Sequence, residues 1–99
     1  MKQSYKMIGN KTITRKRYFF EKGYKQVPMD KSDEVRKKIM DGLGIKHISY
    51  FSTLLNKGFI DISMYRYEVI TEIFSQYGIT DVWDIKNLSN YENTITHTP

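Results

Sequence analysis

Apolar residues in the middle of the chain recur at the spacing of an α-helix. Val35, Ile39 and Leu43 lie four positions apart, so they share one face of a helix. Asp30 or Ser32 can cap the start of this helix by accepting hydrogen bonds from its free backbone N–H groups. Two glycines around the last apolar residue indicate its end. The pattern therefore predicts a helix from about residue 33 to residue 43.

The same spacing predicts two further helices downstream. One runs from about residue 48 to residue 57, and its buried side is expected to hold Ile48, Phe51, Leu54 and Leu55. The other runs from about residue 64 to residue 77, and Ser63 can act as its N-cap. Its apolar stripe consists of Tyr67, Ile70, Ile73, Phe74 and Tyr77.

Shorter helical segments are expected on either side of this central part. Thr14 can cap a helix from about residue 15 to residue 22, which Gly23 would end in a left-handed conformation. A last helical turn is predicted to contain Val82, Trp83 and Ile85. The sustained periods are all helical, whereas residues 1–12 fit an arm or a weak strand and residues 59–62 fit a short apolar link that can be extended. The expected fold class is therefore all-α, a compact bundle of four to five short helices with a basic N-terminal arm.

Length and composition set the domain organisation. The 99 residues are enough for one hydrophobic core, and the chain is 39% apolar and 14% aromatic, which is sufficient to fill that core. We expect a basic N-terminal arm at residues 1–13, a helix-turn-helix domain at residues 14–85 and a flexible polar tail at residues 86–99.

The strongest functional signal is the pair of helices that meet across Leu43-Gly44-Ile45. In a helix-turn-helix, the first helix presents apolar residues four apart, a glycine takes the turn and an apolar residue follows it. The second helix then packs across the first and leaves one face free for the major groove of DNA. Residues 33–57 match this arrangement, and the roles named are filled by Ile39, Leu43, Gly44 and Ile45.

Positive charge is concentrated in the first third of the chain. Residues 1–31 carry a local net charge of +7, residues 32–58 carry +2 and residues 59–99 carry −4, within a total of +5. A polyanion such as DNA would orient a particle polarised in this way. The alternative interpretation is that lysine-rich ends keep a small protein soluble.

The second helix of the motif and the basic segment before the motif supply the expected DNA-binding residues. On the helix and the turn that precedes it, these are Lys46, His47, Ser49, Tyr50, Ser52, Thr53 and Lys57. In the N-terminal segment they are the possible phosphate or minor-groove contacts Lys11, Arg15, Lys16 and Arg17. The exposed helix face holds no Arg, Asn or Gln before Asn56, so the strong bidentate readers of guanine and adenine are missing. Non-specific or shape-based recognition gains weight for that reason.

Catalytic and metal chemistry find little support in the sequence. His47 and His97 are the only histidines and cysteine is absent, so no metal-site spacing occurs. No nucleophile with a general base can be assembled, and Gly42-Leu43-Gly44 lacks the strand and third glycine of a nucleotide loop. We expect no enzyme activity, catalytic residue, cofactor or metal. No membrane span or signal peptide is visible, and we expect a cytoplasmic protein of a bacterial or phage-infected cell.

Four short motifs resemble a known family. They are RKRYFFEKGYKQVP at 15–28, LGI at 43–45, LLNKG at 54–58 and IFSQYGITDVWDI at 73–85. They are similar to small helix-turn-helix proteins related to phage repressors and Cro, in particular to short proteins of Bacteroides-type bacteria and their phages. The resemblance implies DNA binding in transcriptional control, usually as a homodimer. Met40 stands where the motif prefers a small residue, and the turn after Gly44 is one residue longer, which a more open helix crossing accommodates.

Three functions stay open at this point. The first is a phage or mobile-element transcriptional regulator that docks residues 48–57 in the major groove of double-stranded DNA. The second is a phage-encoded interaction module that binds a host or virion protein, and it draws support from the acidic rear with Tyr65, Arg66 and Glu68. The third is single-stranded nucleic acid binding by stacking on Tyr5, Tyr18 and Tyr24, although Tyr18 also fits a core position.

Overall fold

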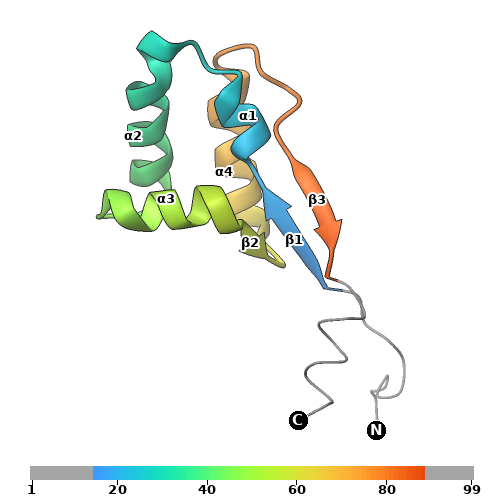
Figure 1. The fold of residues 1–99 in the computed structure, drawn as a ribbon. Coiled ribbons are helices and arrows are strands. Elements are labelled where there is room, and N and C mark those ends of the chain that lie inside the picture. Colours follow the sequence, from blue (N-terminus) through green and yellow to red (C-terminus); the bar gives the residue numbers. More distant parts are fainter. Residues whose placement is uncertain (1–14, 89–99) are drawn as a thin grey trace, which may run out of the picture.

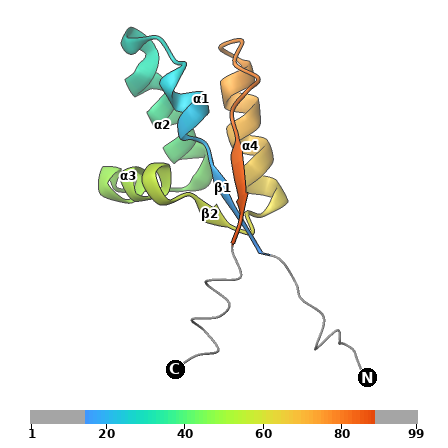
Figure 2. The ribbon, with the colours of Figure 1, turned by 45° about the vertical axis from the view of Figure 1, so that its right-hand side comes forward.

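The computed structural model describes residues 15–88, which form four α-helices, one 3-10 helix and a three-stranded sheet (Figure 1). In chain order the elements are β1 (Lys16–Phe19), α1 (Glu21–Lys25), the 3-10 helix η1 (Met29–Lys31), α2 (Ser32–Leu43), α3 (Ile48–Lys57), β2 (Phe59–Ile60), α4 (Met64–Ser75) and β3 (Asp84–Asn87). In two views, α3 runs across the lower end of α2 (Figures 1 and 2).

The antiparallel sheet shows that the all-α prediction is wrong. β1 is the central strand, with β2 on one side and β3 on the other, so that Tyr18 lies opposite both Phe59 and Ile85. Each strand has only two to four residues, which is too short to display the period-two alternation of a half-buried strand. The backbone hydrogen bonds of each strand are made to segments distant in the chain, so the local sequence pattern does not predict them. The fold is therefore a mixed α/β fold.

The strands replace parts of two segments that the sequence predicts to be helical. The segment expected to be a helix from residue 15 to residue 22 contains strand β1 at Lys16–Phe19 and only the start of the short helix α1, and Gly23 lies inside α1 instead of ending a helix. At the other end, Ile85 belongs to β3, not to a helical turn, and Lys86 and Asn87 continue that strand. The N-terminal arm lies outside the described residues, as does most of the expected tail.

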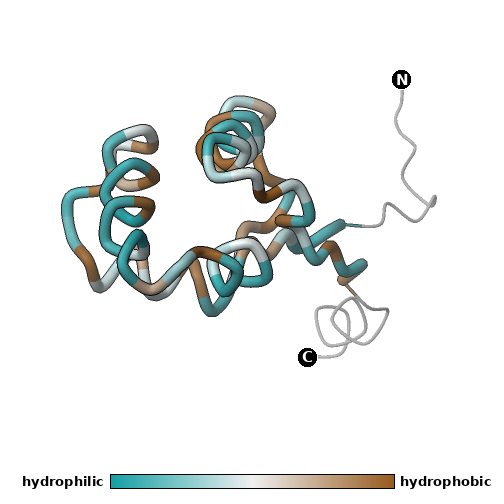
Figure 3. The backbone as a smooth tube through the Cα atoms, turned by 90° about the horizontal axis from the view of Figure 1, so that it is seen from above, coloured by the Kyte–Doolittle hydropathy of each residue, from teal (hydrophilic) through white to brown (hydrophobic). Residues whose placement is uncertain are grey.

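The three central helices confirm the prediction from periodicity. α2 buries Val35 and Ile39, and α3 has the bounds expected for the second helix of the motif. α4 begins after Ser63, whose side chain accepts a hydrogen bond from the Arg66 N–H at 3.2 Å, as expected of an N-cap. The alternation of hydrophobic and hydrophilic positions along the helices is visible in Figure 3. One residue of the predicted buried side of α3 is not buried: Ile48 is 57% exposed.

Phe20 joins the helices to the sheet at the centre of the core. It is fully buried, and its ring centroid lies 5.9 Å from Phe51 of α3 and 6.1 Å from Phe59 of β2. Trp83 makes a third ring contact with Phe20, edge-on at 6.3 Å, and stacks on Tyr67 of α4 at 4.8 Å. These aromatic contacts fix α3 against β1 and against the segment that leads into β3.

Candidate nucleic-acid interface

The chain turns between α2 and α3 at a left-handed glycine, the residue type and position that the sequence predicted. Gly44 ends α2 in the left-handed region, with φ 71° and ψ 27°. Its N–H donates to the Asp41 carbonyl at 3.3 Å, and the Ile45 N–H donates to the Met40 carbonyl at 2.8 Å. This pair of bonds is a Schellman motif, which satisfies carbonyls at the helix end. Ile45 is buried directly behind the turn, and Met40 packs against the core, so the larger residue there is accommodated.

Helix α3 has one buried face and one open face. Phe51 and Leu54 are buried, whereas every residue predicted to contact DNA from this helix and its preceding turn is exposed: Lys46, His47, Ser49, Tyr50, Ser52, Thr53 and Lys57. Ser49, Ser52 and Thr53 lie on the side opposite the buried pair by helical spacing. The Thr53 hydroxyl donates to the Ser49 carbonyl at 3.0 Å and keeps its lone pairs available as acceptors. The open face therefore carries small, uncharged polar groups.

The charges around α3 are uniformly positive. No carboxylate occurs between residue 42 and residue 60. Among residues 15–88, no acidic side chain lies within ion-pair distance of Lys46 or Lys57, or of Arg66 on the first turn of α4. By contrast, six other described cations have carboxylate partners: Arg15, Lys22, Lys25, Arg36, Lys38 and Lys86. Unpaired positive charge thus borders the open face of α3.

Arg15 is engaged within the protein. Its Nε donates to Asp61 Oδ2 at 2.9 Å, and the backbone N–H of Lys16 donates to Asp61 Oδ1 at 3.0 Å. The backbone hydrogen bond from Lys16, followed by the Arg15 contact, lowers the pKa of the Asp61 carboxyl. The ion pair makes Arg15 a weaker candidate for phosphate contact than the sequence indicated. Lys16 is exposed, and Lys11 lies outside the described residues.

Arg17 connects the basic N-terminal segment to the C-terminal end of α3. Its Nη1 donates to the backbone carbonyl of Lys57 at 2.8 Å, so it contributes a hydrogen bond to the C-terminal end of α3. A cation at this end also interacts favourably with the helix dipole. The sequence predicts Arg17 as a DNA-binding residue but gives no sign that it contacts α3. The structure shows this contact.

Gly58 allows α3 to turn directly into β2. Its φ of 72° and ψ of −169° lie in a region that is essentially restricted to glycine. A Cβ at this position would lie 2.6 Å from the Tyr18 carbonyl oxygen in β1. The close approach of the two backbones keeps the end of α3 against the sheet.

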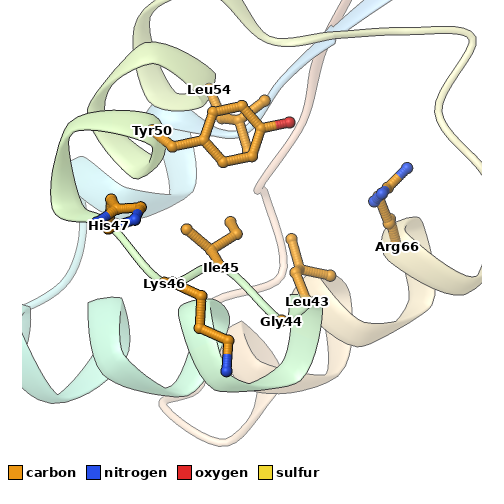
Figure 4. Close-up of a pocket in the computed structure, with 8 residues that line it drawn as sticks. All are labelled: Leu43, Gly44, Ile45, Lys46, His47, Tyr50, Leu54 and Arg66. Carbon is orange, nitrogen blue, oxygen red and sulfur yellow. The ribbon is translucent and has the colours of Figure 1, made fainter.

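A hollow of about 300 Å³ lies between the helix-turn-helix corner and α4 (Figure 4). Leu43, Ile45 and Leu54 give it apolar walls. Its polar lining comes from Lys46, His47, Tyr50 and Arg66, and it includes no carboxylate. Arg66 extends from α4 on one side, and the Tyr50 ring from α3 carries its hydroxyl toward that side (Figure 4).

The interface gains two residues that the predicted set did not include. Asn56 is exposed on α3 and borders a second hollow with Lys22, Lys25 and Lys86, whose ammonium groups all have carboxylate partners. Arg66 lies on the helix that follows the motif, and the sequence alone groups it with the acidic C-terminal part of the chain. Helical spacing from Ser52 and Thr53 could have identified Asn56, whereas only the packing of α4 against the corner reveals Arg66.

Two of the aromatic residues considered for single-stranded nucleic acid are occupied by packing. Tyr18 makes edge-on contacts with Tyr67 and Trp83, each at 6.2 Å between ring centroids. Tyr24 packs on Phe51 at 5.6 Å, and its hydroxyl lies 2.9 Å from Ser32 Oγ. Stacked bases would therefore have to displace core contacts. Tyr5 lies outside the described residues.

In the part of the chain from residue 15 to residue 88, no three His, Cys, Asp or Glu side chains are grouped so that they could hold a metal ion. None of the helices in that part has the length and apolar character needed to cross a membrane.

Comparisons of the chain with protein-family models, with curated proteins and with solved structures give no match.

Proposed function

We propose that this protein binds double-stranded DNA by docking α3 in the major groove, and that it acts as a transcriptional regulator. The observation that carries the proposal is the open face of α3, which is exposed, free of carboxylates and bordered by Lys46 and Lys57 without acidic partners among the described residues. Phosphate neutralisation supplies most of the sequence-independent affinity for DNA, so such a border favours this ligand over a neutral one.

The short side chains on the open face allow α3 to approach DNA closely, but they form few specific hydrogen bonds with base edges. Ser49, Ser52 and Thr53 are short hydroxyl residues that can contact phosphates or base edges. Asn56 is the one side chain of α3 able to form the bidentate pair with adenine. We therefore expect modest sequence preference, with a large share of the affinity from backbone contacts and from DNA shape.

Fluorescence anisotropy with a labelled duplex of mixed sequence tests the proposal. The logarithm of the association constant should fall linearly with the logarithm of salt concentration, by about 0.9 for each phosphate neutralised. Lys46→Gln and Lys57→Gln should each lower this slope by about 0.9. Lys37→Gln, on an exposed position of α2, is the matched control and should leave the slope unchanged. Absence of duplex binding at low salt would contradict the proposal.

Selection from a random duplex library addresses the number of subunits on DNA. A homodimer with a two-fold axis would place its two α3 helices about 34 Å apart, one turn of DNA, and would select a palindromic motif with that half-site spacing. A selected motif without two-fold symmetry would exclude a symmetric dimer on the DNA.

A protein partner is the second candidate, and exposed apolar residues at the start of α4 favour it. Met64 is 74% exposed and Tyr65 is 64% exposed, although the Tyr65 hydroxyl donates to the Gly42 carbonyl at 2.9 Å. Capture of a host or virion protein that survives both high salt and nuclease would favour this function. Loss of every captured partner after nuclease treatment would count against it.

A further inference from the structure

The hollow beside the helix-turn-helix corner combines two features that point to one kind of ligand. Arg66 and Lys46 give its lining positive charge, and no carboxylate lines it. Its walls are formed by aliphatic side chains of the turn and of α3. A ligand with an anionic group attached to a less polar body would match both the positive charge and the walls.

The hollow is also continuous with the open face of α3. Lys46 and Tyr50 belong both to the expected DNA-binding set and to the lining of the hollow. A duplex that receives α3 in its major groove must have a sugar–phosphate backbone on either side of that helix. The hollow lies on one of these sides, between α3 and α4 (Figure 4).

We propose that this hollow receives a phosphodiester of the DNA backbone next to α3, and that Arg66 of α4 is a phosphate contact. This inference rests on the proposed function and extends it to a residue outside the helix-turn-helix. The Arg66 guanidinium can present two parallel N–H donors to one phosphate. The Lys46 side chain points away from Arg66 (Figure 4), so its ammonium adds positive charge to the surroundings of the hollow and not a second contact to that phosphate. The Tyr50 hydroxyl can donate to the same group, while the deoxyribose faces the aliphatic walls.

The position of Arg66 is determined by the start of its helix. The Ser63 side chain accepts a hydrogen bond from the Arg66 backbone N–H, so the cap holds Arg66 on the first turn of α4. Glu68 lies on another part of the helix, where it lines a shallow depression with Tyr67, Thr71 and Glu72. The acidic surface of α4 is therefore distinct from the side on which Arg66 meets the hollow, and Arg66 belongs with the basic border of α3.

The test compares charge-removing and charge-keeping variants on duplex DNA over a range of salt concentrations. Arg66→Gln should lower the salt slope by about 0.9 and weaken binding about eightfold at 0.1 M salt. The loss should be equal on duplexes of different sequence, because a phosphate contact carries no base information. Arg66→Lys should keep a slope close to that of the unaltered protein, and Lys37→Gln controls for a general loss of positive charge.

Four outcomes separate the interpretations, with thermal unfolding used to verify that each variant is folded. A reduced slope for Arg66→Gln and a retained slope for Arg66→Lys support the inference. If Arg66→Gln binds like Lys37→Gln while Lys46→Gln and Lys57→Gln lose affinity, the inference is wrong and the proposed function stands. If the unaltered protein does not bind duplex DNA at low salt, both are wrong. Saturable binding of inorganic phosphate at the Arg66 and Lys46 amide resonances, at constant ionic strength, combined with an unchanged salt slope of Arg66→Gln on duplex DNA, would overturn the backbone assignment in favour of a small-anion site.

Discussion

The Arg17 guanidinium donates to the backbone carbonyl of Lys57 over 2.8 Å and thereby connects the central strand of the sheet to the C-terminal end of α3. The Schellman turn at Gly44 ends the preceding helix, and this bond holds the C-terminal end of the helix expected to enter the major groove. A rigid support of this kind is what a binding surface on a small scaffold requires.

Replacement of Arg17 should affect both stability and DNA binding. Arg17→Gln removes the charged donor, and we expect the free energy of unfolding to fall by about 1 kcal/mol, the usual net value of such a hydrogen bond. DNA affinity should also fall, because the end of α3 becomes less constrained. Urea unfolding and anisotropy measure the two effects. Arg17→Lys, which keeps the charge without the planar donor group, should retain more affinity than Arg17→Gln; equal losses would show that geometry alone matters.

The two glycines that flank α3 should differ in their tolerance of alanine. At Gly58 an alanine would strain the backbone by about 1–3 kcal/mol and would add a contact of 2.6 Å between its Cβ and the Tyr18 carbonyl oxygen. At Gly44 no atom lies within 4 Å of an added Cβ, so only the left-handed conformation costs free energy, about 1–2 kcal/mol. Thermal unfolding should therefore show a larger loss for Gly58→Ala than for Gly44→Ala. The reverse order would contradict the close approach of α3 to β1.

Asp61 should make stability depend on acid pH. Its pKa in the folded state is lowered by the Lys16 backbone N–H and by Arg15, so the ionised carboxylate stabilises the native state at pH values above its unfolded pKa, about 4. This stabilisation is lost as the pH falls through the lower folded pKa. Asp61→Asn should flatten that part of the profile in urea unfolding measured from pH 7 to pH 2. Asn also tolerates the positive φ of 51° at this position, so the variant tests charge more than conformation.

A carboxylate placed on the open face of α3 should weaken DNA binding without unfolding the protein. Ser52 is exposed at the middle of that face, and Ser52→Glu would bring a negative charge against the phosphates and bases. We expect at least a tenfold loss of affinity, the equivalent of about 1.4 kcal/mol. Thr80→Glu, at an exposed position between α4 and β3, is the charge-matched control. Equal binding by the two variants would place the DNA contact elsewhere.

The central helices and the buried side of each could be predicted because helix formation is local. Val35 and Ile39 face the core because residues four positions apart lie on the same side of a helix. Ser63 caps α4 through a hydrogen bond to a residue three positions away. Ile48 was assigned to the buried side of α3 and is exposed, because it lies at the first position of the helix, beyond the surface that the core covers.

Local pattern also identified the exposed face of α3, since the burial of Phe51 and Leu54 leaves Ser52 and Thr53 on the other side. The pattern alone could not identify partners across the fold. Whether a cation is paired depends on which residue packs beside it, and Arg15 meets a carboxylate 46 positions away whereas Lys46 meets none among the described residues.

The amino-acid sequence by itself thus determined the two helices α2 and α3 and the glycine turn that ends α2, because each of these depends on residues close together in the chain. Tertiary structure decided the rest. Strand β1 exists because β2 and β3 satisfy its backbone hydrogen bonds, and Arg17 reaches α3 because that sheet lies beside the helix. Arg66 joins the basic border of α3 for the same physical reason, since a contact between distant segments has no signature in the local spacing of residues.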